Sequence, residues 1–301
     1  MIDGALLLDK PVGLSSNAAL QRAKRALGAR KAGHAGTLDP LASGLLVLLF
    51  GEATKFAGPL LEADKEYLAT LKLGERTSTG DAEGEVVERK PVRVSGEQIV
   101  AALARFRGVS EQVPPMYSAL KRDGVPLYKL ARRGKEVERK PRRVEIASIE
   151  ATDFEPPMLA LRVRCGKGTY IRTLAEDIGA ALGTVAHLAA LRRSAAGRFQ
   201  VRDAMSLEAL ESLPQHARGR GLIPLAKLLA GFPRAELDSL AEARFRNGQP
   251  LSFPGLAEGL CAVYGPSGEV IGLGRAGRDG QLRPSRLTSV SQAADKHRKN
   301  L

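Results

Sequence analysis

The sequence is poor in the residues on which many enzyme mechanisms and metal sites depend. It has no Trp, two cysteines and four histidines among 301 residues. Cys165 and Cys261 lie far apart, so they form neither a C-x-x-C motif nor a disulfide framework. We expect buried free thiols in a reducing cytoplasm. The histidines, at positions 34, 187, 216 and 297, are too dispersed to predict a metal site.

Several catalytic motifs and membrane signals are also missing. There is no P-loop, GxGxxG or HExxH, so nucleotide hydrolysis, dinucleotide binding and zinc proteolysis lack support. The segment "ASGLL" is not a nucleophile elbow, which argues against a Ser-His-Asp hydrolase. The N-terminal segment has no basic n-region, and no apolar run reaches the length of a membrane span. We therefore expect a cytoplasmic protein that does not enter the membrane.

Positive charge is what the sequence has in excess. Lys and Arg number 46 against 33 acids, which gives a net charge of +13 and a pI near 10.0. This balance suits a polyanion such as nucleic acid, although a protein that merely carries extra Arg would show it too. Residues 116–143 hold ten Lys or Arg and three acids, with Tyr117, Leu127 and Tyr128 interleaved. Such a run is typical of a solvated loop, but the apolar residues also fit a flap over an RNA backbone.

Hydrophobic patterning predicts strands and helices in one large part of the chain and strands in a small one. A buried strand in "ALLLDKP" precedes a helix over 17–29, which Ser15 or Ser16 can cap and Gly28 can end. The run "GLLVLLFGEATKF" fits either a strand or a buried helix.

Further along, the run "KEYLATLKLG" alternates as a strand that keeps Tyr67 on the same face as Ala69 and Leu71. Another helix is expected from about 170 to 182. Residues 213–233 are rich in Pro and Gly and mark a boundary. The short strand-like runs beyond them predict a small β-rich module.

The stretch "GHAGTLDPLASGLL", residues 33–46, contains one carboxylate, Asp39. An Asp before a Pro is most often a simple turn residue. Gly33 and Gly36, however, permit close approach of the backbone to a ligand. A half-desolvated carboxylate needs a partner to stay ionised, and Arg172 at the start of a helix is a candidate.

This stretch resembles the catalytic loop of the TruB-type tRNA pseudouridine synthases, which isomerise uridine-55 in the T-loop of tRNA. The resemblance runs in order over most of residues 4–230, through "DKPVGLSS", "GEATKF", "DKEYLATLKLG", "RTSTGDAEGEV", "CGKGTYIRTLAEDIG" and "LRRSAAGRF". The basic run "QVPPMYSALKRDGVPLYKLARRGKEVERKPR" is similar to the insertion with which that family grips the T-loop.

The resemblance implies an α+β fold, with a mixed, mainly antiparallel sheet in the catalytic core, helices, and a small PUA-like C-terminal domain. It implies no cofactor and no metal. The expected catalytic domain covers 1–230, with a basic insertion at 116–143. The PUA-like domain is expected at 231–290, and a disordered tail at 291–301.

The resemblance also implies roles for single residues. Asp39 corresponds to the essential Asp of the family, Arg172 to the Arg that pairs with it, and Tyr67 to a Tyr that stacks on the flipped uracil. His34 would fill the stack that the flipped nucleotides leave, and Leu191 would pack against the base. Taken alone, Tyr67 and Leu191 would be ordinary core residues, His34 a structural residue and Arg172 a surface residue.

Other substrate contacts are expected in the loop, at the helix start and in the basic insertion. These residues are Gly36, Thr37, Tyr170, Lys121, Arg122, Lys129, Arg132, Arg133 and Lys135. The cations would bind phosphates, which sets affinity and not sequence choice. Lys10 and Pro11 are expected to support the catalytic loop from the neighbouring strand.

One carboxylate suffices for this isomerisation because the base is never released to water, unlike in glycosidases with paired carboxylates. Asp39 could attack C1′, add to C6 of the base or assist loss of the 2′ proton, and the sequence leaves these routes open. Two other functions remain possible: an RNA-binding PUA protein with an inactive core, and an aspartate-dependent nucleoside hydrolase. We expect tRNA as the partner, and a monomer, because a large RNA must reach the site.

Overall fold

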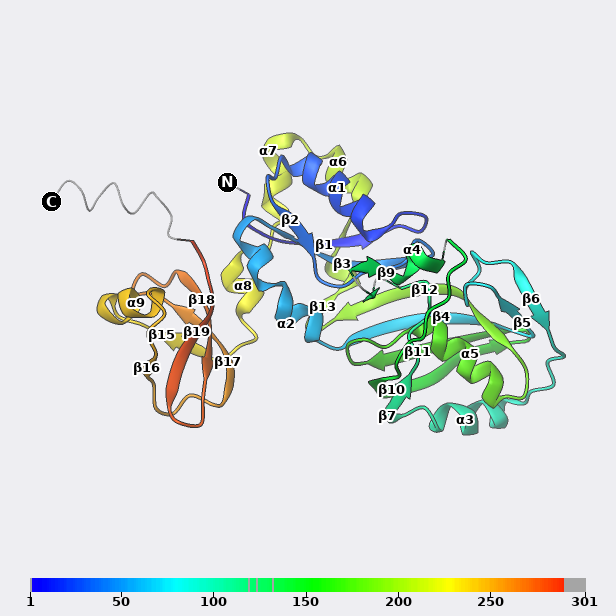
Figure 1. The fold of residues 1–301 in the computed structure, drawn as a ribbon. Helices are drawn as coiled ribbons and strands as arrows, with labels where there is room; N and C mark the ends of the chain where they lie inside the picture. The colour runs from blue at the N-terminus through cyan, green and yellow to red at the C-terminus, as the bar shows by residue number, and fades with distance from the viewer. Residues whose placement is uncertain (1, 119, 123, 132, 290–301) are drawn as a thin grey trace.

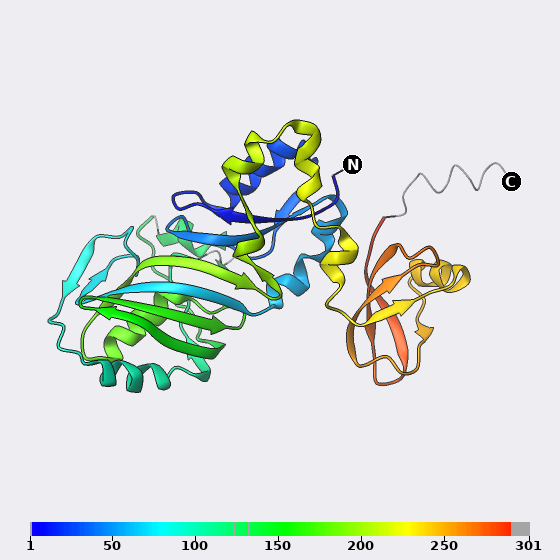
Figure 2. The ribbon, with the colours of Figure 1, turned by 180° about the vertical axis from the view of Figure 1, so that it is seen from behind.

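The computed structural model describes residues 2–289 apart from 119, 123 and 132. The expected tail at 291–301 and Arg132 therefore lie outside the described residues. Figures 1 and 2 show two bodies side by side: a large sheet with helices packed on it, and a smaller β-rich body formed after residue 233.

Ten strands form the large sheet, in the order β14-β1-β3-β12-β4-β11-β10-β7, with β2 paired to β3 and β13 to β12. Its pairs are antiparallel except for β1 with β14 and β3 with β12. A mixed, mainly antiparallel sheet confirms the predicted fold class. The strands are β1 Gly4–Lys10, β2 Ala32–His34, β3 Ala42–Phe50, β4 Lys65–Leu73, β7 Gly108–Gln112, β10 Arg142–Glu155, β11 Met158–Cys165, β12 Ala186–Ala196, β13 Phe199–Gln200 and β14 Met205–Ser206.

Local sequence signals explain where the main helices begin and end. The Ser15 hydroxyl accepts a hydrogen bond from the Ala18 amide at the start of α1, and Gly28 ends this helix at a φ of +64°. The helix expected near 170–182 is α5, Ile171–Ala181. The ambiguous run after residue 44 is a strand, β3, followed by a 3₁₀ turn, η1. The helices and 3₁₀ turns of this body are α1 Ser16–Leu27, η1 Gly51–Phe56, α2 Ala57–Glu62, α3 Gly96–Ala104, α4 Leu127–Ala131, α5, η2 Val201–Asp203, α6 Leu207–Ser212, α7 Gln215–Arg218, η3 Gly219–Gly221 and α8 Leu225–Leu229.

One face of the large sheet carries a row of paired residues from four adjacent strands. Lys10 of β1 pairs with Gly44 of β3, Gly44 with Arg193 of β12, and Arg193 with Tyr67 of β4. An apolar cluster under α1 lies at one end of this face, and a second cluster under α5 lies at the other. Tyr67 and Leu191 pack against both clusters. They therefore mark the place where the two helix-covered regions of the sheet meet.

The smaller body is a five-stranded sheet with one helix, in the order β15-β17-β18-β19-β16. Its elements are β15 Arg234–Glu236, α9 Ser239–Arg246, β16 Leu251–Ser252, β17 Gly259–Tyr264, β18 Val270–Ala276 and β19 Gln281–Leu287. The expected β-rich C-terminal module is thus present. We keep 1–230 and 231–290 as the proposed domain limits.

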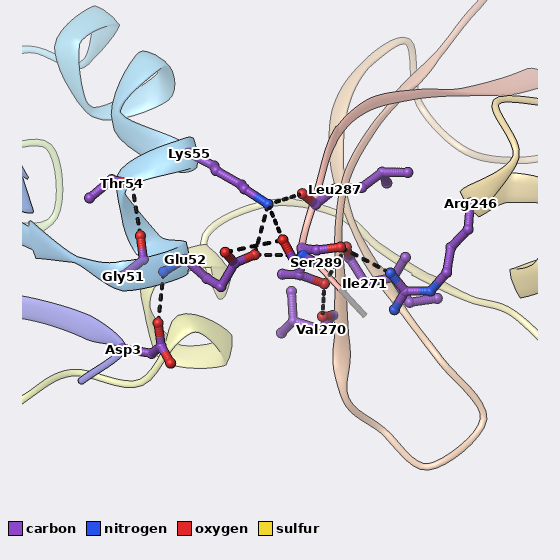
Figure 3. A network of polar contacts seen from close by, with 11 residues as sticks. Asp3, Gly51, Glu52, Thr54, Lys55, Arg246, Val270, Ile271, Leu287 and Ser289 are labelled. Atoms are coloured by element: carbon purple, nitrogen blue, oxygen red, sulfur yellow. Dashed lines mark hydrogen bonds and ion pairs between the residues drawn. The ribbon is translucent and has the colours of Figure 1, made fainter. Parts of the chain in front are cut away.

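Apolar packing and a polar network join the two bodies. Tyr264 and Leu273 of the small sheet belong to one buried cluster with residues of β1, β3 and α8. Beside it, Lys55 donates to the Leu287 carbonyl at 3.2 Å and to the Ser289 hydroxyl at 2.9 Å, and it pairs with Glu52 at 2.8 Å (Figure 3). Pairs as accessible as this contribute about 0–1 kcal/mol, so the apolar cluster is the main contact.

Other expectations concern the cysteines and the membrane. Cys165 and Cys261 are free and buried, as predicted. Among the described residues, none of the helices has both the length and the apolar character needed to cross a bilayer.

Two small hairpins complete the fold: β5 Glu75–Thr77 with β6 Val86–Arg89, and β8 Lys121–Arg122 with β9 Val125–Pro126.

Candidate active site

The loop between β2 and β3 carries Asp39, and its backbone is fixed on both sides of this residue. The Ser16 hydroxyl, at the start of α1, accepts from the Leu38 amide at 2.7 Å and donates to the Leu38 carbonyl at 2.9 Å. The amide of Gly13, in the turn after β1, donates to the Pro40 carbonyl at 2.8 Å. Ser16 and Gly13 of the segment "DKPVGLSS" therefore support the loop, while the support expected from Lys10 and Pro11 stays a prediction.

Asp39 and Arg172 meet, although 132 residues of chain lie between them. Arg172 Nη2 lies 3.0 Å from Asp39 Oδ2. The Arg172 side chain is 7% exposed and that of Asp39 is 43% exposed. The alternative interpretation of Arg172 as a surface residue is therefore wrong, and the predicted pair is present.

A second carboxylate, Asp81, pairs with the same guanidinium. Its Oδ2 lies 3.6 Å from Arg172 Nε, and its side chain is 5% exposed. Arg172 also donates to the Thr79 carbonyl at 3.2 Å and to the Tyr117 carbonyl. The Arg is thus fixed at four points and presents one edge to Asp39. The sequence reasoning missed Asp81; its turn-forming context, "STGDAEG", was the available signal.

The charges around Asp39 act on its protonation in opposite directions. Burial raises the pKa of the Asp39 carboxyl, Arg172 opposes this effect, and Asp81 reinforces it. Lys10 is buried and donates to the carbonyls of Pro11 and Leu14 at 2.7 and 2.6 Å. Burial lowers the pKa of Lys10 to about 8, and Asp39 opposes that shift. Arg172 is therefore the main group that keeps Asp39 ionised.

Tyr67 and Leu191 lie on the face of the sheet that the Asp39 loop approaches. Burial raises the pKa of the Tyr67 phenol, while its neighbour Arg193 lowers it. Leu191 pairs with Ala42, the first residue of β3, and with Ala69 of β4. Tyr67 and Leu191 are partly buried and pack against the core, so each can contribute to packing and still present part of its side chain to a base.

The remaining predicted contacts of the loop lie before Asp39 and at the start of α5. Gly36 and Thr37 belong to the loop, and Thr37 is exposed. His34 ends β2; burial lowers the pKa of its ring, and its Nδ1 has no hydrogen-bond partner among the described residues. Tyr170 precedes α5, where its amide donates to Gln112 Oε1 at 3.0 Å. Burial raises the pKa of the Tyr170 phenol.

The basic insertion reaches the site through its backbone and presents its cations to solvent. The Tyr117 carbonyl accepts a hydrogen bond from Arg172, so the beginning of the insertion is linked to Asp39 through this arginine. The predicted phosphate contacts that the structure describes are all exposed. They are Lys121, Arg122, Lys129, Arg133 and Lys135. No group of three or more His, Cys, Asp or Glu among the described residues is arranged to hold a metal ion.

Three family models match successive parts of the chain. Residues 24–171 match the N-terminal domain of the TruB family pseudouridylate synthases, and residues 172–230 match the tRNA pseudouridylate synthase B C-terminal domain. Residues 233–288 match a third model, Pseudouridine synthase II TruB, C-terminal. The matches cover both bodies of the structure.

Curated relatives and solved structures agree with the family models. The tRNA pseudouridine synthase B of Dechloromonas aromatica is 51% identical over 96% of this chain and 97% of its own length. That of Aromatoleum aromaticum is 52% identical over 98% and 95%. A chain in the crystal structure of a Cbf5-Nop10-Gar1 complex superposes with a TM-score of 0.73 at 27% identity, covering 96% of this chain and 84% of that one. The protein therefore belongs to the TruB family of pseudouridylate synthases.

Proposed function

We propose that this protein converts uridine-55 in the T-loop of tRNA to pseudouridine, with Asp39 as its catalytic carboxylate. The observation that carries the proposal is the Asp39–Arg172 pair at 3.0 Å, on a loop whose backbone is fixed. The relatives named tRNA pseudouridine synthase B supply the substrate class.

The geometry leaves one oxygen of Asp39 available for chemistry. Arg172 binds Oδ2, and within the described part of the chain no hydrogen-bond donor lies on Oδ1. An ionised carboxylate with one free oxygen can attack C1′, add to C6 or assist loss of the 2′ proton. All three routes break the N1–C1′ bond, let the uracil rotate, and form C5–C1′ without an activated water.

The roles proposed for the other residues are those that the family resemblance implies. Tyr67 stacks on the flipped uracil, Leu191 packs on it, and His34 occupies space that the flipped nucleotide leaves in the RNA. The exposed cations of the insertion bind phosphates of the T-stem and loop. The C-terminal body is PUA-like, the enzyme acts as a monomer, and it acts in the cytoplasm without a metal or cofactor.

A tRNA transcript tests this function directly. The wild-type protein is incubated with the transcript, and position 55 is assayed for pseudouridine, with Asp39→Asn in parallel. The matched control is Asp9→Asn, because Asp9 also pairs with an arginine, Arg192, at 2.7 Å, but on the opposite face of the sheet. We expect product with the wild type and with Asp9→Asn, and none with Asp39→Asn.

The same assay separates the two other functions. A nucleoside hydrolase would release free uracil, and a binding protein with an inactive core would bind the transcript and leave uridine-55 unchanged. Unmodified uridine-55 after incubation with the wild-type protein would refute the proposed function.

A further inference from the structure

Arg193 is a charged residue that is buried in the core with no acidic partner in the described part of the chain. Its exposure is 1%, and it heads the fully buried side chains by volume. Among the described residues no carboxylate forms an ion pair with it. Buried charges are normally paired, because removing them from water is costly. A buried, unpaired guanidinium therefore calls for an explanation.

The guanidinium is satisfied by backbone carbonyls that flank Asp39 on either side. Nε donates to the Leu45 carbonyl at 2.7 Å, Nη2 to the Gly36 carbonyl at 3.1 Å, and Nη1 to the Thr37 carbonyl at 3.4 Å. Gly36 and Thr37 precede Asp39 in the loop, and Leu45 lies in β3 just after it. One planar group thus fixes both ends of the segment that carries Asp39.

Two glycines of the stretch 33–46 lie against Arg193. A Cβ on Gly44 would lie 2.3 Å from the Arg193 carbonyl oxygen, so β3 and β12 could not approach each other with a side chain there. Gly36 has a φ of +100°, and a Cβ on it would lie 3.4 Å from Arg193 Nη1. Gly44 therefore lets the backbones of β3 and β12 come close beside Arg193, and the positive φ of Gly36 is the reason that a glycine suits that position.

On its other side Arg193 is the cross-strand neighbour of Tyr67. Paired residues on adjacent strands project from the same face of a sheet, with Cβ atoms about 5 Å apart. Arg193 thus lies between the backbone that carries Asp39 and the ring proposed to stack on the uracil. The distance between these two groups depends on the size and planarity of this one side chain.

We propose that Arg193 is a positioning residue for the isomerisation, whose planar guanidinium sets the spacing between the Asp39 loop and Tyr67. The proposal rests on the proposed function, because it presupposes that Asp39 and Tyr67 act on the same base. It assigns Arg193 no contact with the RNA, so its substitution should affect turnover and leave binding intact.

The test is Arg193→Lys, which keeps a cation but cannot donate along three directions in one plane. Its matched control is Arg192→Lys. Arg192 is the next residue of β12, faces the opposite side of the sheet and is 40% exposed, paired with Asp9. Single-turnover rates and dissociation constants are measured with the same tRNA transcript.

A displacement of about 1 Å in an active site can cost about 100-fold in rate. We therefore expect Arg193→Lys to be about 100-fold slower with a dissociation constant within about 3-fold of wild type. Arg193→Gln, which is neutral and planar, should be at least as slow. Arg192→Lys should stay within about 3-fold of wild type in both measurements.

Three results would overturn the proposal. A rate for Arg193→Lys within about 3-fold of wild type would show that the planar fork is not needed. Failure of both Arg193 variants to fold, seen by circular dichroism, or parallel losses of rate and binding would assign Arg193 to stability alone. An inactive wild-type protein would refute the proposed function instead, which the parallel wild-type reaction distinguishes.

Discussion

The loop around Asp39 and the basic insertion at 116–143 are held in opposite ways. The loop is fixed through its backbone by Ser16 at the start of α1, Gly13 in the turn before it and Arg193 of β12. The five described cations predicted to bind phosphates are exposed: Lys121 and Arg122 lie on the short strand β8, Lys129 on the five-residue helix α4, and Arg133 and Lys135 in the segment that follows α4. Fixed geometry suits a step that demands alignment, whereas exposed charge suits phosphates that can be met in several arrangements. We therefore expect the loop to determine the rate of the reaction and the insertion to determine the affinity for tRNA.

The largest effects on the rate should come from the groups that hold Asp39 in place and keep it ionised. We expect Arg172→Gln and Asp81→Asn each to lower the single-turnover rate by about 100-fold or more, because misaligned groups lose orientation and electrostatic stabilisation. The dissociation constant for tRNA should stay within about 3-fold of wild type. Arg162→Gln, which breaks an exposed pair with Glu150, is the control. Equal losses of rate and binding in Arg172→Gln would identify Arg172 as a phosphate contact.

The insertion should show the reverse behaviour. Replacing Lys121, Arg122, Lys129, Arg133 and Lys135 by Ala should weaken tRNA binding by about 100-fold at low salt. The salt slope should fall by about 0.7–0.9 for each phosphate that the protein no longer neutralises. The rate at saturating enzyme should be unchanged. Binding measured between low and high salt checks this prediction, and an unchanged slope would place the RNA elsewhere on the protein.

A smaller effect is expected on the pH dependence of the rate. Since Asp39 must be ionised, the rate should fall as the pH falls through its pKa, which burial raises above the ordinary value. Arg172 lowers that pKa, so residual activity of Arg172→Gln should be lost at a higher pH than that of the wild type. Single-turnover rates across acidic pH test this. If the rate of Arg172→Gln falls at a lower pH than that of the wild type, Arg172 does not lower the pKa of Asp39, and this prediction is contradicted.

The smallest effect should come from Ser16, the hydroxyl that holds the loop at Leu38. Ser16→Ala leaves the buried amide and carbonyl of Leu38 without their partner, which should cost about 1–3 kcal/mol in the free energy of unfolding. It should also lower the rate by about 10-fold by loosening the loop. Ser15→Ala removes only the helix cap, at about 1 kcal/mol, and should leave the rate unchanged. Urea unfolding and single-turnover rates measure the two effects, and equal rates for the two variants would show that Ser16 does not position the loop.

Much of the site could be predicted because its residues lie in local motifs. The helix start at Arg172, the face of Tyr67 and the loop at Asp39 each follow from short-range patterns, and the family resemblance joined them. The contact between Asp39 and Arg172 could not come from spacing alone, because it depends on how β3, β12 and α5 assemble.

The residues that sequence reasoning missed are those whose burial contradicts their type. The central strand β12, "AHLAALRRSAA", has no β-branched or aromatic residue apart from its His, so its sequence does not predict a strand. Arg193 in this strand is fully buried, whereas arginine is usually exposed. Asp81 and Ser16 have the appearance of turn and cap residues. Their roles depend on long-range contacts with Arg172 and Leu38 that local patterns do not show.

The most direct test compares Asp39→Asn with the five-residue insertion variant on one tRNA transcript at saturating enzyme. We predict that the insertion variant forms pseudouridine at position 55 at the wild-type rate, while Asp39→Asn binds the transcript and forms none. Product from Asp39→Asn, or a slow insertion variant even at saturation, would contradict the assignment of chemistry to the fixed loop and affinity to the insertion.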